Sequence, residues 1–298
     1  MAFDINAYLA EKQALVNKAL DLVLPGEKTR PAEIHGAMRY ALFAGGKRLR
    51  PILALAAAQA VGADPAGVLR ESCALEILHT YTLIHDDLPA MDDDDYRRGR
   101  LTTHKVYGEA IAVLAGDALL TEAFKVLADS MTEGRHEPRT LLSVIQLLAD
   151  AGGSRGVIGG QVVDMLSEGK QIDKDVLEYI HTHKTGLLIT ASVLLGAVLA
   201  QATEEQNNRL CDYSRAIGLA FQITDDILDV QGSAEELGKP VGSDQERGKA
   251  TYPAIFGMNE AKRMQGVLFE QAIEALRDFD ENAEPLRAIA KLIIERNK

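Results

Sequence analysis

The 298-residue chain has no tryptophan and only two cysteines. Cys73 and Cys211 both lie in apolar, helix-like surroundings, which argues against a disulfide framework and predicts a reducing cytoplasmic location. The N-terminus lacks a basic stretch followed by an apolar core, so we predict no signal peptide. The uncharged run over residues 186–202 is shorter than the ~20 apolar residues of a membrane span. We therefore expect a buried core helix there and no membrane span.

Basic residues are in deficit. Lysine and arginine number 32 against 44 aspartates and glutamates, which leaves a formal net charge of −12. A nucleic-acid-binding protein needs a basic face, so the composition argues against that class of partner. An acidic chain that binds an anionic substrate must instead use metal ions or local basic pockets.

The arrangement of apolar residues predicts helices almost throughout. They recur with the helical period over residues 5–24, 32–44, 51–61, 71–88, 110–131, 139–151, 173–199 and 204–230, with two or three more helices beyond residue 251. Glycine and proline separate these segments at 133–138, 152–160 and 232–242. No strand-like alternation bounded by hairpin turns is present. We expect an all-α fold, a large helical bundle in a single domain over residues 1–298.

An acidic motif ends the helix predicted over residues 71–88. Its six carboxylates belong to Asp86, Asp87, Asp92, Asp93, Asp94 and Asp95, and three arginines follow at Arg97, Arg98 and Arg100. So many like charges repel one another unless cations lie among them, and hard oxygen ligands suit Mg2+ that is shared with substrate phosphates. Asp86 and Asp92 do not share a face of an ideal helix, but Pro89 interrupts the helix and lets Asp92 turn back. This first Asp motif, residues 86–95, predicts a site for Mg2+ and a diphosphate.

A second Asp motif, residues 225–229, contains Asp225, Asp226 and Asp229. Asp225 and Asp229 are four residues apart, hence about 40° apart around a helix axis, and face the same cavity. Two such carboxylates can share one or two divalent ions. Both motifs follow strongly apolar helix, which predicts that the charge lies at the mouth of an apolar cavity rather than on an outer face.

The two motifs together resemble those of the trans-isoprenyl diphosphate synthases, and within that family the bacterial farnesyl diphosphate synthases. The similarity includes GGKRLRP at 45–51, HKTG at 183–186, FQITDDILD at 221–229 and GKATYP at 248–253, and the first motif has the longer DDxxxxD form. The resemblance implies an all-helical isoprenoid synthase fold around a deep central cavity, usually as a homodimer. It also implies head-to-tail condensation of isopentenyl diphosphate with dimethylallyl and then geranyl diphosphate, to give farnesyl diphosphate.

The resemblance further implies roles for individual residues. It implies about three Mg2+ ions per site, with Mn2+ as a substitute, and the metal ligands would be Asp86, Asp87, Asp92, Asp225 and Asp229. The allylic diphosphate would bind Arg97, Lys184, Lys239 and Lys249. Isopentenyl diphosphate would bind Lys47, Arg50, His79 and Arg98, a basic pocket that needs no metal. Thr185 and Gln222 would direct oxygens at the allylic cation, and the last proton would leave to the released diphosphate.

Product length is expected to depend on Tyr81. This residue lies five positions before Asp86, about 7.5 Å lower along the helix, where a bulky ring would form the floor of the cavity. In the resembling family such a ring accompanies a fifteen-carbon product. Asp117 and Asp164 are further candidates for supporting roles.

Several alternatives remain open. A geranyl or geranylgeranyl diphosphate synthase would share the same motifs. A class I terpene cyclase shares the metal-triggered ionisation but needs no pocket for isopentenyl diphosphate, and an inactive partner subunit would usually lose one Asp motif. A di-iron carboxylate bundle is suggested by two Glu-x-x-His pairs, Glu76 with His79 and Glu178 with His181. That site would leave the second Asp motif unexplained.

Overall fold

The computed structural model describes residues 3–231 and 251–295. Its helices and two short strands are α1 (Ile5–Val23), α2 (Ala32–Leu42), α3 (Leu49–Ala60), η1 (Pro65–Val68), α4 (Leu69–Asp86), β1 (Tyr96–Arg97), β2 (Arg100–Leu101), α5 (Thr103–Tyr107), α6 (Glu109–Thr132), α7 (Pro138–Gly152), α8 (Val157–Ser167), α9 (Lys174–Ile180), η2 (His181–Gly186), α10 (Leu187–Leu199), α11 (Glu204–Gln231), α14 (Tyr252–Phe256), α15 (Met258–Ala275), η3 (Glu281–Ala283) and α16 (Glu284–Ile294). The prediction of an all-α bundle is confirmed.

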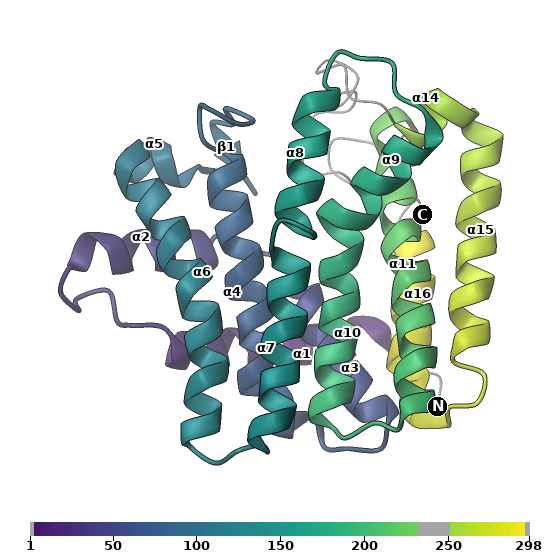
Figure 1. Cartoon of the computed structure of the whole chain (residues 1–298), viewed down its shortest axis with the longest axis horizontal. Helices are drawn as coiled ribbons and strands as arrows, with labels where there is room; N and C mark the ends of the chain where they lie inside the picture. The colour runs from purple at the N-terminus through teal and green to yellow at the C-terminus, as the bar shows by residue number, and fades with distance from the viewer. Residues whose placement is uncertain (1–2, 232–250, 296–298) are drawn as a thin grey trace.

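The long helices run alongside one another (Figure 1). Helix α4 packs against α6, α10 packs against both α3 and α11, and α11 packs against α15. The β1–β2 hairpin, α8, α9 and α14 gather at the upper end of the bundle in Figure 1. Since β1 follows α4 and α14 follows α11 in the sequence, the ends of α4 and α11 that carry the two Asp motifs lie toward this same end.

Two apolar cores meet at α3 and α10. The first is formed mainly by α1, α2, α4, α6 and α7, and the second by α11, α15 and α16, while α3 and α10 supply residues to both. Gly196 on α10 lies directly against Ala54 on α3, where any Cβ would collide with the backbone oxygen of Ala54. Burial of both faces explains why the 186–202 run is uncharged, because any unpaired charge there would be desolvated.

Two described stretches, Pro138–Ser167 and Lys174–Leu199, are long and apolar enough to cross a membrane by length and composition alone. In the most apolar window of each stretch, 39% of the first window and 56% of the second window are buried in the bundle. A core helix of a helical bundle passes the same test, and α10 contributes to both cores.

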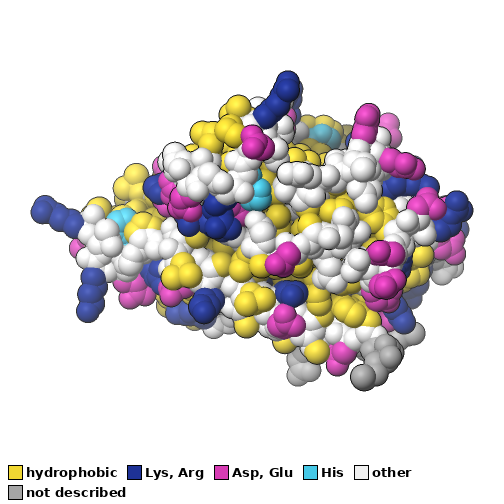
Figure 2. Space-filling view, turned by 90° about the horizontal axis from the view of Figure 1, so that it is seen from below, with side chains coloured by type: hydrophobic (Ala, Val, Ile, Leu, Met, Phe, Trp, Pro, Cys, Tyr) yellow, Lys and Arg dark blue, Asp and Glu magenta, His cyan; other side chains and the backbone are white. Residues whose placement is uncertain are grey.

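The opposite end of the bundle from the Asp motifs carries interspersed acidic, basic and apolar side chains, without a continuous basic surface (Figure 2).

Three local features differ from the expectation. Helix α8 occupies residues 157–167, although the glycines at 152–160 were expected to separate helices. Residues 173–199 were expected as one helix, but residues 181–186 widen into a π-helical turn between α9 and α10. The hairpin was not expected either: Arg98 and Gly99 both have positive φ, 53° and 75°, which joins two-residue strands through a tight primed turn.

Candidate active site

The end of α4 brings the backbones of Asp86 and Asp92 of the first Asp motif together. The helix ends at Asp86, and the backbone N–H of Asp92 donates to the carbonyl of Asp86 at 2.8 Å. Asp93 adopts a left-handed backbone with φ 51° and donates its N–H to Leu88. The prediction that the chain turns back at Pro89 is confirmed: the turn reverses the chain and places Asp92 beside the last residue of the helix.

Asp87 turns toward the hairpin. Its Oδ1 accepts from Nε of Arg97 at 2.6 Å, and the Arg97 guanidinium also lies 3.5 Å from Asp94. Burial raises the pKa of Asp87 to about 6, although the Arg97 charge acts in the opposite direction. Asp87 and Arg97, expected to contact a metal and a diphosphate respectively, therefore form an ion pair in this structure, in which Asp87 is buried and Arg97 is half-buried.

Lys184 connects the first Asp motif to the π-helical turn. Its Nζ forms an ion pair with Asp164 on α8 at 2.7 Å. Burial lowers the pKa of Lys184, but the charges of Asp164, Asp86 and Asp92 outweigh burial and leave this pKa above its ordinary value. The charges of Asp86 and Asp92 in the first Asp motif therefore act on Lys184, and Asp164 is its direct partner.

The π-helical turn is packed closely from two sides. A Cβ on Gly160 of α8 would collide with the backbone of Lys184, and a Cβ on Gly218 of α11 would lie 3.1 Å from Cα of Gly186. Gly186 follows Thr185, and Gln222 lies one turn beyond Gly218, so these two candidate residues lie on facing segments. Both side chains are half-buried.

The second Asp motif ends α11. Asp225 and Asp229 share a helix face, whereas Asp226 is 8% exposed and bonded elsewhere. Its Oδ2 accepts from Nε2 of His181 at 2.9 Å and from the backbone N–H of Tyr252 at 2.7 Å. The sequence indicated His181 only as part of the alternative di-iron pattern and Asp226 only as a member of the second Asp motif.

Three of the four residues expected to bind isopentenyl diphosphate interact electrostatically: His79 on α4, Arg50 in the first turn of α3 and Arg98 in the turn of the hairpin. Burial lowers the pKa of Arg50 to about 10, where the Glu76 charge raises it and the Arg98 charge lowers it. Burial and the charges of Arg50 and Arg98 hold the pKa of His79 well below its ordinary value. Nε of Arg50 is buried and has no hydrogen-bond partner among the described residues. We call Arg50, His79 and Arg98 the basic cluster; its unbalanced positive charge is suited to an anion.

Arg48 has a structural role, which the sequence pattern did not indicate. It is 3% exposed and donates to Glu76 at 2.9 Å, to Asn17 at 2.8 Å and to the carbonyl of Leu42 at 2.7 Å. Its left-handed backbone, φ 53°, lies between Lys47 and the start of α3. Arg48 therefore anchors the loop that carries Lys47 and leads into the first turn of α3, where Arg50 lies.

These pairings leave little support for a di-iron site. Glu76 bonds to Arg48, and His181 bonds to Asp226. Glu178 lies 3.4 Å from Lys174. Within the described residues, no three acidic, histidine or cysteine side chains are grouped so that they could hold a metal ion.

Comparison with known proteins places this arrangement in a family. Residues 31–292 match the family model described as "Polyprenyl synthetase". The chain belongs to the polyprenyl synthetase family. It is 46% identical over 297 residues to a geranylgeranyl diphosphate synthase of Cyanophora paradoxa, covering 99% of this chain and 97% of that protein. It is also 45% identical over 293 residues to a farnesyl diphosphate synthase of Geobacillus stearothermophilus, covering 98% of each.

A solved structure agrees with the sequence relatives. The apo crystal structure of an FPP/GFPP synthase from Zymomonas mobilis superposes with a TM-score of 0.88 at 35% identity, covering 98% of this chain and 100% of that one. The chain is therefore a polyprenyl synthetase with the all-α isoprenoid synthase fold. The relatives differ in the product that their names give.

In this polyprenyl synthetase, Tyr81 lies on the face of α4 that meets α6. Its ring packs edge-on against His85 at 5.6 Å between centroids, and Nε2 of His85 bonds to the carbonyl of Val113 on α6 at 3.0 Å. Burial raises the pKa of Tyr81 to about 12, and its hydroxyl has no hydrogen-bond partner in the part of the chain that the structure describes. Asp117 lies beside His85, 4.0 Å from its Nε2, and is exposed.

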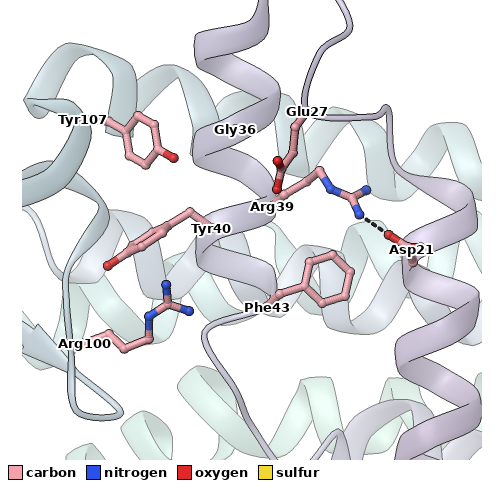
Figure 3. Close-up of a pocket in the computed structure, with 8 residues that line it drawn as sticks. All are labelled: Asp21, Glu27, Gly36, Arg39, Tyr40, Phe43, Arg100 and Tyr107. Carbon is pink, nitrogen blue, oxygen red and sulfur yellow. Dashed lines mark hydrogen bonds and ion pairs between the residues drawn. The ribbon is translucent and has the colours of Figure 1, made fainter.

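A separate pocket of about 550 Å3 lies between α1, α2, β2 and α5 (Figure 3). Two acidic and two basic side chains line it, and one acid, Asp21, is already paired with Arg39. Arg100 lies over the Tyr40 ring at 4.6 Å. The lining has no net charge and contains neither Asp motif, so it is less suited to a diphosphate than the region around Lys184. Lys239 and Lys249 lie outside the described residues.

Proposed function

We propose that this polyprenyl synthetase condenses isopentenyl diphosphate head to tail with dimethylallyl diphosphate and then with geranyl diphosphate, and releases farnesyl diphosphate. The observation that carries the proposal is the division of the site into two parts. Lys184 is paired with Asp164 and is affected by the charges of Asp86 and Asp92 in the first Asp motif, whereas Arg50, His79 and Arg98 form a basic cluster with no acidic excess. A reaction between two diphosphates, only one of which must ionise, needs both environments.

The carboxylates suit Mg2+. Asp86 and Asp92 are joined through the backbone, and Asp225 and Asp229 share one face of α11. Mg2+ is commonly held by one or two carboxylates together with substrate phosphate oxygens, so the side chains need not complete the coordination themselves. These four residues, with Asp87, would hold the ions, about three of them, and Mn2+ would be accepted by the same oxygens. Bound Mg2+ would neutralise charge that develops on the leaving diphosphate.

The chain's own residues account for the remaining requirements. Lys184 and Arg97 would bind the allylic diphosphate, assisted by Lys239 and Lys249, and keep it in place as its bond to carbon breaks. Thr185 and Gln222, on facing segments, would turn oxygens toward the allylic cation. The released diphosphate would take the final proton.

The basic cluster would hold isopentenyl diphosphate. Arg50 and Arg98 offer planar donors that match phosphate oxygens, and the depressed pKa keeps His79 neutral near pH 7, able to donate one hydrogen bond. Lys47, next to the anchor Arg48, would complete the set. A terpene cyclase has no use for such a cluster.

Geranylgeranyl diphosphate is the second candidate product, favoured by the relative from Cyanophora paradoxa. We favour farnesyl diphosphate because Tyr81 presents a bulky buried ring about 7.5 Å below Asp86. We further propose that the enzyme acts in the cytoplasm as a homodimer, without spanning a membrane and without binding nucleic acid.

Product analysis tests the proposal directly. The purified protein would be incubated with Mg2+, isopentenyl diphosphate and dimethylallyl diphosphate, and the products identified by mass. We expect a fifteen-carbon diphosphate whose formation is abolished by EDTA and by Asp86→Ala. A twenty-carbon product would favour the second candidate, and no condensation from either allylic starter would overturn the proposed reaction.

A further inference from the structure

The bonds of Asp226 in the second Asp motif tie together three described segments, namely α11, the π-helical turn and α14. Its Oδ2 receives the His181 imidazole from the π-helical turn and the first backbone N–H of α14 from Tyr252. The side chains of His181 and Asp226 are 7% and 11% exposed. A carboxylate oxygen that already accepts two hydrogen bonds in a buried place is poorly available to a metal ion.

Helix geometry separates Asp226 from Asp225. It lies about 100° around the axis of α11 from Asp225 and about 60° from Asp229, whereas Asp225 and Asp229 are about 40° apart. The motif therefore presents two carboxylates on one face and directs the third toward His181.

We propose that Asp226 is a positioning residue that fixes the π-helical turn carrying Lys184 and Thr185 and joins that turn to the start of α14. The inference rests on the proposed function, because that function gives Lys184 and Thr185 on the turn their roles in the reaction. His181 opens the turn and is tied to α11 through Asp226, and Lys184, three residues later, is tied to α8 through Asp164. The two ties hold the turn from opposite sides.

The turn needs such support because its geometry is unusual. A π-helical turn is rare, occurs mostly as a single turn within α-helices, and is frequent at functional sites. Shifts of about 1 Å in a group that contacts a reacting substrate can cost roughly 100-fold in rate. Loss of the Asp226 bonds would release His181 and displace Lys184 and Thr185 without removing either of them.

Three variants test this role. Asp226→Asn keeps the shape but removes the charge that both donors share. His181→Gln places an amide nitrogen near the position of Nε2 and preserves a donor, whereas His181→Phe keeps a ring and removes the donor. Ser130→Ala is the matched control, because it removes a buried hydrogen bond to Glu71 at the end of α6, away from both motifs.

The expected results distinguish positioning from metal binding. Asp226→Asn and His181→Phe lower kcat about 10- to 100-fold, the range typical of supporting residues in such sites. The KM for isopentenyl diphosphate and the Mg2+ concentration for half-maximal rate stay within about twofold, the double variant is no slower than either single one, and His181→Gln recovers most of the loss. Ser130→Ala leaves kcat unchanged.

Amide hydrogen exchange supplies a readout that does not depend on activity. The Tyr252 amide is expected to exchange faster in Asp226→Asn than in the wild-type protein or in Ser130→Ala. A raised Mg2+ requirement in Asp226→Asn, comparable to that of Asp225→Asn, would instead make Asp226 a ligand, and unchanged kcat with unchanged exchange would remove the role entirely. If the wild-type protein forms no prenyl product, the proposed function fails, while exchange at Tyr252 still decides whether Asp226 holds α14. Should Asp226→Asn not fold, the contrast between His181→Gln and His181→Phe remains decisive.

Discussion

Tyr81 illustrates how one buried side chain can govern product size. Its ring is 5% exposed, rests against His85, and carries a hydroxyl with no partner. Tyr81→Ala would remove the ring and leave space that a longer chain can fill. We expect the main product to lengthen from fifteen to twenty or more carbons, measured by mass. Thr82→Ala, one residue further along α4, is the control and should leave the distribution unchanged; an unaltered distribution in Tyr81→Ala would show that another residue limits growth.

Arg50 is expected to bind substrate while it lowers the stability of the substrate-free protein. Its Nε is buried without a partner and its charge is repelled by Arg98, so the free protein carries a cost that a bound anion would offset. Arg50→Met should raise the KM for isopentenyl diphosphate roughly 10- to 100-fold, which corresponds to loss of a charged hydrogen bond. The thermal midpoint of the substrate-free protein should rise. A lower midpoint with an unchanged KM would make Arg50 a structural residue like Arg48.

At the scale of helices, the sequence pattern predicted most elements because burial imposes the helical period on them. It missed α8 because glycine usually interrupts helices, whereas Gly160 is required here by the close approach of α8 to Lys184. It also missed the π-helical turn and the hairpin, whose conformations depend on contacts from distant segments. The roles of Arg48 and Asp226 were hidden for the same reason: partners 28 and 45 residues away in sequence define them.

Gly160 gives a test at this scale. A methyl group in Gly160→Ala would collide with the backbone of Lys184, so α8 and the π-helical turn must separate. Overpacking of this kind costs about 1–3 kcal/mol, and we expect a comparable loss in the free energy of unfolding together with a lower kcat. Gly67→Ala is the control, because a Cβ there meets no atom within 4 Å. Full activity and stability in Gly160→Ala would show that the two segments yield without affecting Lys184.

At the scale of the molecule, the site lies where two apolar cores meet. Helix α4 supplies the first Asp motif from one core and α11 supplies the second from the other, with α3 and α10 shared between them. Residue spacing alone predicted which carboxylates share a face. Which carboxylate faces His181 depends on how the two cores pack, and residue spacing does not reveal that packing.

The outer surface of the bundle leads to the last prediction. Helix α7 packs against both α6 and α8. These three helices expose several large apolar side chains, namely Val113, Leu114, Met131, Leu142, Ile158, Val162, Met165 and Leu166. An apolar surface on consecutive helices is typical of a protein interface, so we expect a dimer by light scattering. Leu142→Glu, at a position 59% exposed, should shift the protein toward monomer, whereas Leu22→Glu, on α1 and 77% exposed, should not. A wild-type protein that is monomeric and fully active would contradict the expected homodimer and leave these side chains without an assigned partner.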